Sequence, residues 1–524
     1  MTRYRVAALL LVLACFAAGS GAGAQEYDLI IRGGRVLDGT GNPWYFADIA
    51  VTGDRIAAMG DLGDATARRT IDAAGLYVAP GFIDSHSHAG GGLARESLSR
   101  ARPLLAQGVT TVFVNPDGGG PIDMLEQREA LLEHGLGVNV AQMMPHGSVR
   151  GAVLGPADRA PSAAELEDMR ALVRAGMEAG AFGLSSGPYY APGSFASTEE
   201  LIDLAKIAAE YDGVYTSHIR DEADYTIGVV AAVDEVIRVA REAALPGIVT
   251  HIKVLGPRVW GYSGALVKRI ERAREQGIEV FADQYPYEAS STSLAAALLP
   301  RWAQAGGRDS LAARLADATV RQRVRSEMVE NLERRGGADR IQFASWTDHS
   351  VEGSTLDQVA AQRGIHPIDL ALEMVAGNSP SIVSFNMDED DIALLMVQPW
   401  TMTSSDGTLV EMGSGVPHPR AYGTFPRKLR RYVVERGVVS LEHAIRSMTS
   451  LPAAVLRVPD RGMLRPGAFA DIVVFDLARV RDAATYQQPH QLAEGMVHVL
   501  VNGRLAVDGG SFTESLHGRV LSRK

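Results

Sequence analysis

Hydrophobic and polar positions alternate at both ends of the sequence, as they do in strands that bury one face. The alternating stretches are Tyr27–Ile31, Ile49–Val51, Leu76–Val78, Asp471–Phe475 and Val497–Val501. Gly53-Asp54 and Asn502-Gly503 add turn signals between such stretches. Because the two ends of a domain often lie close together, we expect residues 25–80 and 455–524 to form one small β-sandwich.

The middle of the chain alternates short apolar runs with Ala-, Leu-, Glu- and Arg-rich helical stretches, which is typical of parallel strands with crossover helices. The expected strands are Phe82–Asp84, Thr110–Val114, Val138–Gln142, Phe182–Ser185, Val214–Ser217, Ile248–Thr250, Val280–Ala282 and Thr401–Ser404, with Ile382–Phe385 as a ninth possibility. Eight strands are the number in a (β/α)₈ TIM-type barrel, so we expect an α/β barrel over residues 81–454. Residues 294–340 are too many for an ordinary connection and predict a helical insertion over the barrel mouth.

The first 24 residues have the pattern of a signal peptide. Arg3 and Arg5 precede an apolar run from Val6 to Ala18, and Ala22-Gly23-Ala24 has the form of a cleavage site. The apolar run is shorter than the about 20 residues that a spanning helix needs. We therefore expect cleavage after Ala24 and a periplasmic or secreted protein, with a lipid anchor at Cys15 as the weaker alternative.

Composition narrows the function classes. The 524 residues, 46% of them hydrophobic, are enough for a large core and a smaller one. A formal net charge of -11 argues against a broad surface for nucleic acid or anionic membranes, because such surfaces need a positive field. Cys15 is the one cysteine of the chain. Once the leader is removed, a metal ion would have to be held by histidines and carboxylates.

Polar residues directly follow the expected barrel strands. His86 and His88 follow the first strand, His218 the fifth, His251 the sixth and Asp406 the eighth. The carboxyl ends of barrel strands form the active-site face, so these five residues are expected on one rim. Neutral imidazoles with a carboxylate suit zinc with an open position for water. Zinc lowers the pKa of bound water to about 7 and polarises carbonyl groups, which predicts a hydrolase.

These motifs also carry a family resemblance. The stretch Pro80–His88 resembles the first metal motif of the amidohydrolase superfamily. Further stretches resemble D-aminoacylases, the N-acyl-D-amino-acid deacylase family: Ser217–Glu222, Thr250–Lys253, Ala282–Tyr287, Ser404–Gly407 and His418–Arg427. The resemblance covers nearly all of the chain after the leader. It implies zinc-dependent hydrolysis of the amide bond of an N-acyl amino acid, with one or two ions.

The resemblance assigns roles to the rim residues. It implies that His86, His88 and Asp406 surround a first metal position and that His218 and His251 surround a second. In the family a cysteine bridges the two positions, and Asp117 stands at that place in this chain. A carboxylate can bridge two ions, so we expect Asp117 to be a ligand. The alternative is an Asp that forms a local turn before Gly118–Gly120.

The same resemblance implies a catalytic and a substrate-binding set. Asp406 would take a proton from water and pass it to the leaving nitrogen. The residues expected to contact the substrate are Lys253, Tyr285, Ser291, Arg420, His146 and Arg150. For each of them a surface or packing role is the alternative. The apolar stretch Leu294–Leu299 favours an apolar amino acid if it lines the pocket, and is otherwise a buried helix start.

Two other functions remain open at this point. A cyclic amidase of the hydantoinase or dihydroorotase kind would use a carboxylated lysine as its bridge, and no lysine lies near Ser185 and Ser186 after the fourth strand. A non-catalytic solute-binding protein on a degenerate barrel is the alternative from another class. The five residues on one rim favour the enzyme.

Overall fold

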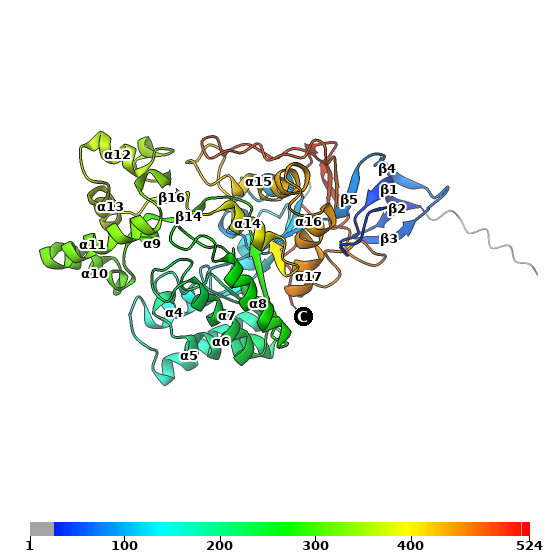
Figure 1. Cartoon of the computed structure of the whole chain (residues 1–524). Helices are drawn as coiled ribbons and strands as arrows, with labels where there is room; N and C mark the ends of the chain where they lie inside the picture. Colours follow the sequence, from blue (N-terminus) through cyan, green and yellow to red (C-terminus); the bar gives the residue numbers. More distant parts are fainter. Residues whose placement is uncertain (1–25, 515, 524) are drawn as a thin grey trace, which may run out of the picture.

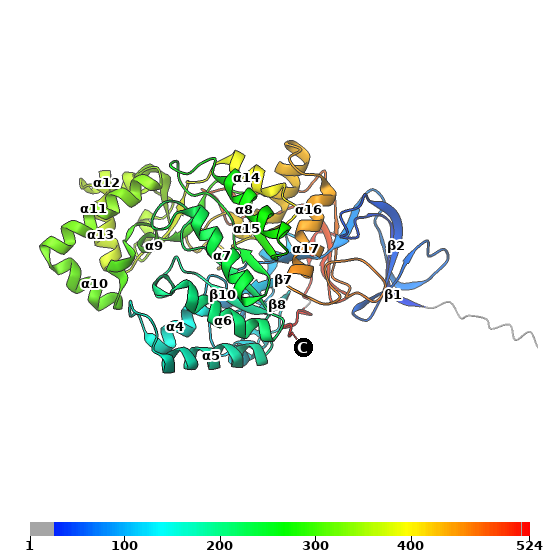
Figure 2. The same cartoon turned by 60° about the horizontal axis from the view of Figure 1, so that its bottom comes forward.

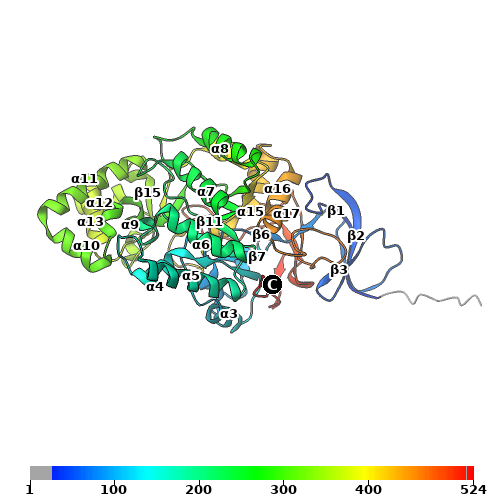
Figure 3. The same cartoon turned by 90° about the horizontal axis from the view of Figure 1, so that it is seen from below.

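The computed structural model describes residues 26–514 and 516–523, so the expected leader, with Cys15, lies outside the described residues. The described chain has three parts (Figures 1, 2 and 3). A barrel lies in the centre, a mostly helical lobe lies at one end and a β-sheet built from both chain ends lies at the other. Among the described helices, none combines the length and the apolar character that crossing a bilayer requires.

The terminal sheet joins the two ends of the chain. Its strands are β1 (Tyr27–Val36), β2 (Tyr45–Thr52), β3 (Arg55–Gly60), β4 (Ala67–Asp72), β5 (Tyr77–Pro80), β18 (Ile472–Phe475), β19 (Met496–Val501), β20 (Arg504–Asp508) and β21 (Ser511–Phe512). The strand order is β21-β20-β19-β18-β5-β1-β2-β3, with β4 beside β1. β5 and β18 pair antiparallel, with Ala79 opposite Val473. This pairing links the N-terminal and C-terminal segments immediately before the barrel begins.

The barrel strands follow the expected order, and their bounds differ from the expected ones by at most two residues. They are β6 (Phe82–Asp84), β7 (Val109–Val114), β8 (Asn139–Gln142), β10 (Gly183–Ser186), β11 (Val214–Ser217), β12 (Gly247–Val249), β13 (Val280–Gln284) and β17 (Thr401–Thr403), and β9 (Met144–Pro145) continues β8. Every pairing between neighbours is parallel.

Backbone hydrogen bonds close the barrel where the strand ladders stop. Phe182 N donates to Gln142 O at 2.9 Å, between the third and fourth strands. Asp406 N donates to His86 O and His88 N donates to Gly407 O, each at 2.9 Å, between the segments that follow the first and last strands. The expected TIM-type barrel is therefore confirmed, and its closing seam carries three of the residues expected at the rim.

Helices form the outer layer of the barrel. The longer ones are α3 (Met124–Leu132), α4 (His146–Leu154), α5 (Ala163–Glu178), α6 (Thr198–Glu210), α7 (Val229–Ala243), α8 (Ser263–Glu275), α14 (Glu389–Met396), α15 (Arg420–Arg427) and α16 (Leu441–Met448). Three short ones are α1 (Gly90–Leu93), α2 (Arg102–Leu105) and α17 (Ser450–Val455), and a π-helical segment, Lys428–Glu435, follows α15. Ser162 caps α5 through a capping box with Glu165. α7 buries Val233 and Val236 in a core shared with α6 and α8.

The lobe contains more of the chain than the sequence suggested. It consists of β14 (Ser290–Ser293), α9 (Leu294–Leu298), α10 (Gly307–Ala316), α11 (Ala318–Arg334), β15 (Ile341–Ser345), α12 (Leu356–Arg363), α13 (Pro367–Ala376) and β16 (Ser381–Ser384). The ninth candidate strand, Ile382–Phe385, corresponds to β16. It pairs antiparallel with both β14 and β15, so it belongs to the lobe and not to the barrel. Leu294, Leu298 and Leu299 lie in the core of this lobe.

Candidate metal centre

The seam between β6 and β17 positions the first group of side chains. Asp84, the last residue of β6, accepts hydrogen bonds from Ser405 N at 2.8 Å and from Ser405 Oγ at 2.5 Å. These bonds fix the segment that carries Asp406 against the segment that carries His86 and His88. Asp406 has φ 49° and His251 has φ 35°, in the left-handed region that residues other than glycine seldom adopt. Such strain clusters at functional sites, because the surrounding fold must hold it in place.

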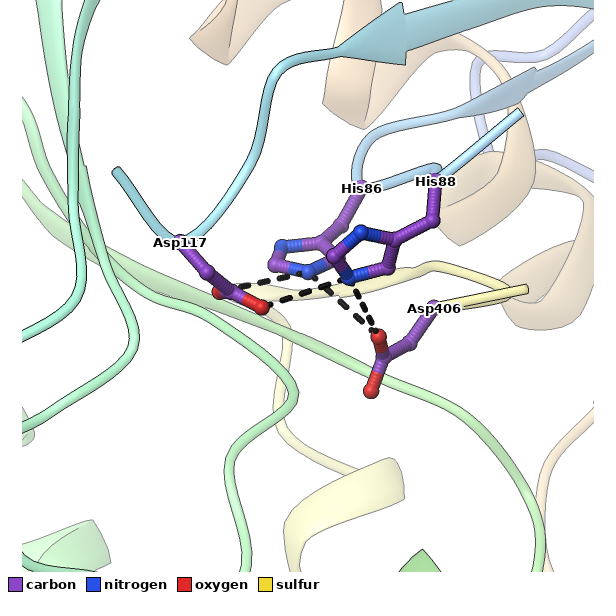
Figure 4. A group of neighbouring side chains, drawn as sticks. All are labelled: His86, His88, Asp117 and Asp406. Carbon is purple, nitrogen blue, oxygen red and sulfur yellow. Dashed lines mark ion pairs between the residues drawn. The ribbon is translucent and has the colours of Figure 1, made fainter. Parts of the chain in front are cut away.

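His86, His88, Asp117 and Asp406 point toward one another in a compact group (Figure 4). Asp117 Oδ1 lies 3.4 Å from His86 Nε2, and Asp117 Oδ2 lies 3.3 Å from His88 Nε2. Asp406 Oδ1 lies 3.2 Å from His88 Nε2 and 3.6 Å from His86 Nε2. Two ligand atoms that bind one tetrahedral zinc ion are separated by about 3.3 Å. The four side chains therefore have the spacing of a metal site.

A second group lies beside the first and consists of His218, Glu222 and His251. His218 Nδ1 lies 3.1 Å from Ile219 O, which fixes the proton on Nδ1 and leaves Nε2 free to bind a metal. His251 Nδ1 lies 3.1 Å from Glu222 Oε1, while its Nε2 lies 3.5 Å from Asp117 Oδ1. Asp117 thus lies between the two groups.

The electrostatics of both groups suit a cation. His86 Nε2 and Asp117 Oδ1 are buried and have no hydrogen-bond partner. Burial lowers the pKa of His88, but Asp117 and Asp406 outweigh burial and raise it to about 9. Burial lowers the pKa of His218 to about 4, which keeps the imidazole in the neutral form that binds metals. The two carboxylates thus favour a positive charge at this place, and the buried ligand atoms have no hydrogen-bond partner. Both features fit a divalent ion held by nitrogen and oxygen donors.

Four of the expected substrate contacts line a cavity of about 640 Å³ next to the two groups: Lys253, Tyr285, Ser291 and Arg420. Arg420 Nη1 lies 2.6 Å from Asp406 Oδ2, and its guanidinium lies 4.7 Å from the centre of the Tyr285 ring. Lys253 Nζ donates to Glu222 Oε1 at 2.5 Å and lies 2.7 Å from His251 Nδ1. Ser291 Oγ donates to Ile382 O at 2.9 Å.

His146 and Arg150 do not reach this cavity. Both side chains are fully buried and contact the carboxylate of Glu200, with His146 Nε2 at 2.9 Å from Glu200 Oε1. Glu200 belongs to α6, so the two residues fasten α4 to α6 behind the third and fourth strands. Their positions fit the packing alternative and not substrate contact.

Three groups at the cavity were not among the expected site residues. Glu222 lies within the motif Ser217–Glu222, and its spacing of i, i+4 from His218 was the available signal. The ring of Tyr190, which follows β10, lies 4.7 Å from the ring of His218, and burial raises the pKa of its phenol well above the ordinary value. Arg335 lines the cavity from the lobe, 84 positions beyond His251 in sequence, and no local pattern could have placed it there.

Comparisons with known proteins agree with this architecture. A family model described as the amidohydrolase family matches residues 69–507. The D-aminoacylase of Alcaligenes xylosoxydans xylosoxydans is 35% identical over 95% of this chain and 98% of its own.

Two solved structures match the whole fold. An N-acyl-D-glutamate deacylase from Bordetella bronchiseptica, complexed with zinc and a phosphonate mimic of the tetrahedral intermediate, superposes with a TM-score of 0.82 at 36% identity, over 95% of this chain and 100% of that chain. A D-aminoacylase studied for its binuclear metal centre superposes with a TM-score of 0.80 at 35% identity, over 95% of this chain and 100% of that one. The chain therefore belongs to the amidohydrolase family, and within it to the D-aminoacylases.

Proposed function

We propose that this protein is a zinc-dependent hydrolase that cleaves the amide bond of an N-acyl-D-amino acid. The observation that carries the proposal is the convergence of two histidine groups on Asp117, beside a cavity lined by Lys253 and Arg420. The relatives support the reaction and the stereochemistry, since they are named as D-aminoacylase and N-acyl-D-glutamate deacylase.

The metal positions follow from the two groups. His86, His88 and Asp406 would hold one ion, and His218 and His251 would hold the other. Asp117 would contribute to both positions, because its Oδ1 lies near His86 and His251 and its Oδ2 lies near His88. Nitrogen and carboxylate donors without a thiolate suit zinc, which is the metal in one of the solved relatives. A bound divalent ion supplies a Lewis acid for the amide carbonyl and lowers the pKa of water.

Asp406 is the group that moves the proton. Its Oδ2 is paired with Arg420, whereas Oδ1 faces the histidines and is the atom that takes the proton of the attacking water. Burial raises the pKa of Asp406, but the charges of Arg420 and His251 hold it below its ordinary value, so the carboxylate is ionised before reaction. The same oxygen then returns the proton to the leaving nitrogen.

The amino-acid part of the substrate needs its carboxylate held. Arg420 and Lys253 supply the positive charge, and Tyr285 supplies a hydroxyl donor at the lining of the same cavity. Ser291 also lines the cavity, and its hydroxyl would have to leave Ile382 O in order to donate to a substrate. Burial raises the pKa of Tyr285 well above its ordinary value, so its phenol keeps its proton. A substrate held at these four residues would place its amide bond beside the metal positions.

The test is hydrolysis by zinc-loaded protein of a panel of N-acetyl-D- and N-acetyl-L-amino acids, with hydantoin and dihydroorotate as cyclic amides. We expect release of the D-amino acid, loss of activity with a chelator and recovery with zinc. Hydrolysis of the cyclic amides alone would assign the second hydrolase class. Stoichiometric zinc without turnover of any N-acyl amino acid would overturn the proposal.

We also propose that the protein is exported. The charged, apolar and small-residue regions of Met1–Ala24 support this location. Expression of the full chain in a Gram-negative host, followed by N-terminal sequencing of the periplasmic protein, tests it. A chain that starts at Gln25 is the expected result, whereas an uncleaved cytoplasmic protein contradicts export.

A further inference from the structure

The cavity beside the metal centre contains a buried arginine, Arg335, for which no carboxylate of the described residues lies at ion-pair distance. Arg335 directly follows α11, and its side chain is 1% exposed, yet it lines the cavity. Its Nη2 donates to the phenol oxygen of Tyr189 at 3.1 Å. When the amide oxygen of Asn386 faces the arginine, Nη1 donates to it at 3.1 Å. Its Nε has no hydrogen-bond partner, and within residues 26–514 and 516–523 it forms no ion pair with a carboxylate.

This arrangement is costly for the protein alone. Arginine keeps its charge at all ordinary pH values, and a buried charge without a counter-ion is strongly disfavoured. Tyr189 and Asn386 are neutral, so they orient the guanidinium without balancing its charge. The charge of Glu222 also acts on Arg335, but this carboxylate is paired with Lys253 and forms no ion pair with Arg335. A planar guanidinium held in this way is suited to a carboxylate, which it binds through paired hydrogen bonds. The missing partner is therefore an anionic group of a ligand.

The other two cations of the cavity are the proposed partners of the α-carboxylate, and each of them also has an acidic neighbour within the protein. Lys253 is paired with Glu222, and Arg420 is paired with Asp406. The three carboxylates of the cavity, Glu222, Asp406 and Asp117, balance the positive charges of Lys253, Arg420 and Arg335. Each divalent ion that binds in the metal centre would therefore give the cavity a net positive charge. A substrate with one carboxylate would leave Arg335 uncompensated. A substrate with two carboxylates would not.

The wall next to Arg335 is polar. Asn386 lies 3.1 Å from Ser290 Oγ and therefore connects Arg335 to β14, whose residues Ser290, Ser291, Thr292 and Ser293 all line the cavity. Leu294, Leu298 and Leu299 are buried in the lobe core, so the apolar side-chain pocket that the sequence allowed is absent from the described cavity lining. Ser291, an expected contact of the α-carboxylate, is next to Ser290 on the same strand. Asn386 and Ser290 thus connect the arginine to the strand that carries Ser291, and its assignment to the amino-acid part of the substrate rests on this connection.

We propose that Arg335 binds the side-chain carboxylate of an acidic N-acyl-D-amino acid, so that the substrates are of the N-acyl-D-glutamate or N-acyl-D-aspartate class. This inference rests on the proposed deacylase function. It assigns a specificity-determining role to a lobe residue that contacts neither metal group.

The experiment compares substrates that differ only in the second carboxylate. Zinc-loaded wild type, Arg335→Met and Arg335→Lys are assayed with N-acetyl-D-glutamate, N-acetyl-D-glutamine and N-acetyl-D-methionine. We expect wild type to prefer the glutamate derivative over the glutamine derivative, and Arg335→Met to lower kcat/KM for the glutamate derivative about 10- to 100-fold, the usual effect of losing a charged hydrogen bond. Hydrolysis of the glutamine derivative should change little, and Arg335→Lys should keep part of the preference.

Arg334→Met is the matched control, because Arg334 neighbours Arg335 but pairs with Asp224 and lies outside the cavity lining. Its substrate preference should equal that of wild type. An equal loss on all substrates in Arg335→Met would mean a purely structural role and would overturn the proposal. If Arg335→Met does not fold, the wild-type ratio decides, since equal rates on the glutamate and glutamine derivatives exclude a carboxylate subsite.

Two further outcomes separate the alternatives. N-succinyl-D-leucine has its second carboxylate in the acyl group. If Arg335→Met impairs this substrate and spares N-acetyl-D-glutamate, the side-chain assignment is wrong. Absence of turnover with every N-acyl-D-amino acid contradicts the deacylase function itself, whereas turnover of N-acetyl-D-methionine without preference for acidic side chains contradicts the role of Arg335 alone.

Discussion

Oδ2 of Asp117 lies 3.3 Å from Nε2 of His88, although 28 positions separate the two residues in the sequence. They meet because β6 and β7 are parallel neighbours, so the loops that follow both strands emerge at the same end of the barrel. Asp117 has φ 55° and is followed by Gly118 with φ 71°, so the tight turn and the ligand position are features of the same residue. The turn is what aims the carboxylate at the histidines.

Asp117→Ala should lower the metal content of purified protein below that of wild type, because the carboxylate lies near histidines of both groups. Asp117→Cys should keep more metal than Asp117→Ala, since a thiolate is also a zinc ligand. Elemental analysis after gel filtration measures both. Asp158→Ala removes an exposed carboxylate and serves as the control. An unchanged metal content in Asp117→Ala would show that Asp117 forms a turn and is not a metal ligand.

Asp406→Asn should lower kcat about 10²- to 10⁴-fold, the usual contribution of a positioned acid-base group. The amide keeps the shape of the carboxylate but cannot take the proton from water. Steady-state kinetics together with circular dichroism and Tm distinguish this loss from unfolding. A variant with wild-type kcat would show that another group carries the proton.

Glu222→Gln should weaken metal binding about 10- to 100-fold, the usual effect of losing a carboxylate that supports a ligating histidine. The variant removes the charge that faces His251 Nδ1 and pairs with Lys253. Competition with a chromophoric chelator measures the affinity. Equal affinities for the variant and wild type would limit Glu222 to holding Lys253.

Lys428 makes stability depend on pH in a defined direction. Its side chain is 2% exposed, and Nζ donates to Thr403 Oγ1 and Ser447 Oγ, each at 2.8 Å. Burial lowers its pKa to about 7, whereas a lysine in the unfolded chain has a pKa of about 10.4. Between these values the unfolded chain binds a proton that the folded chain lacks, so the contribution of Lys428 to folding stability rises with pH.

Lys428→Met should therefore stabilise the protein most at pH 7 and below, and its advantage over wild type should shrink as pH rises toward 10. The measurement is the Tm of metal-loaded wild type and variant at several pH values. The difference in Tm between the two proteins removes the effect of all groups that titrate equally in both. Thr403 and Ser447 keep a hydrogen bond at 3.1 Å in the variant, so no hydroxyl is stranded. A difference in Tm that is constant with pH would contradict the low pKa.

Much of the barrel could be predicted because its signals are local. Phe82–Asp84 and Val214–Ser217 were expected at the bounds that β6 and β11 have, since short apolar runs between helical stretches identify buried parallel strands. Ile382–Phe385 has the same local pattern and was ambiguous for that reason. Only its antiparallel partners β14 and β15 assign it to the lobe, and pairing partners are not encoded in the strand's own residues.

The site shows the same limit at the level of single residues. His86 and His88 follow a strand at a fixed spacing, so their meeting was predictable from barrel geometry. His146 and Arg150 also follow a strand, but Glu200 of α6 binds both in the interior and keeps them away from the cavity. Tertiary packing decides whether such a side chain binds a buried partner or faces the cavity. The spacing of residues along the sequence gives no information on that packing.

The sequence by itself determined most of the barrel strands, the rim histidines and the class of chemistry, because each depends on residue types at short spacing. The tertiary structure decided which of those residues lie together in one group, and which cation of the cavity has no ion-pair partner within the described chain. Arg335 is the clearest case. It belongs to the lobe, and only tertiary contacts place its side chain at the cavity, beside Tyr189. No ion pair with a carboxylate forms at Arg335 among the described residues, because Tyr189 and Asn386 occupy its guanidinium, and these three segments meet only once the chain has folded.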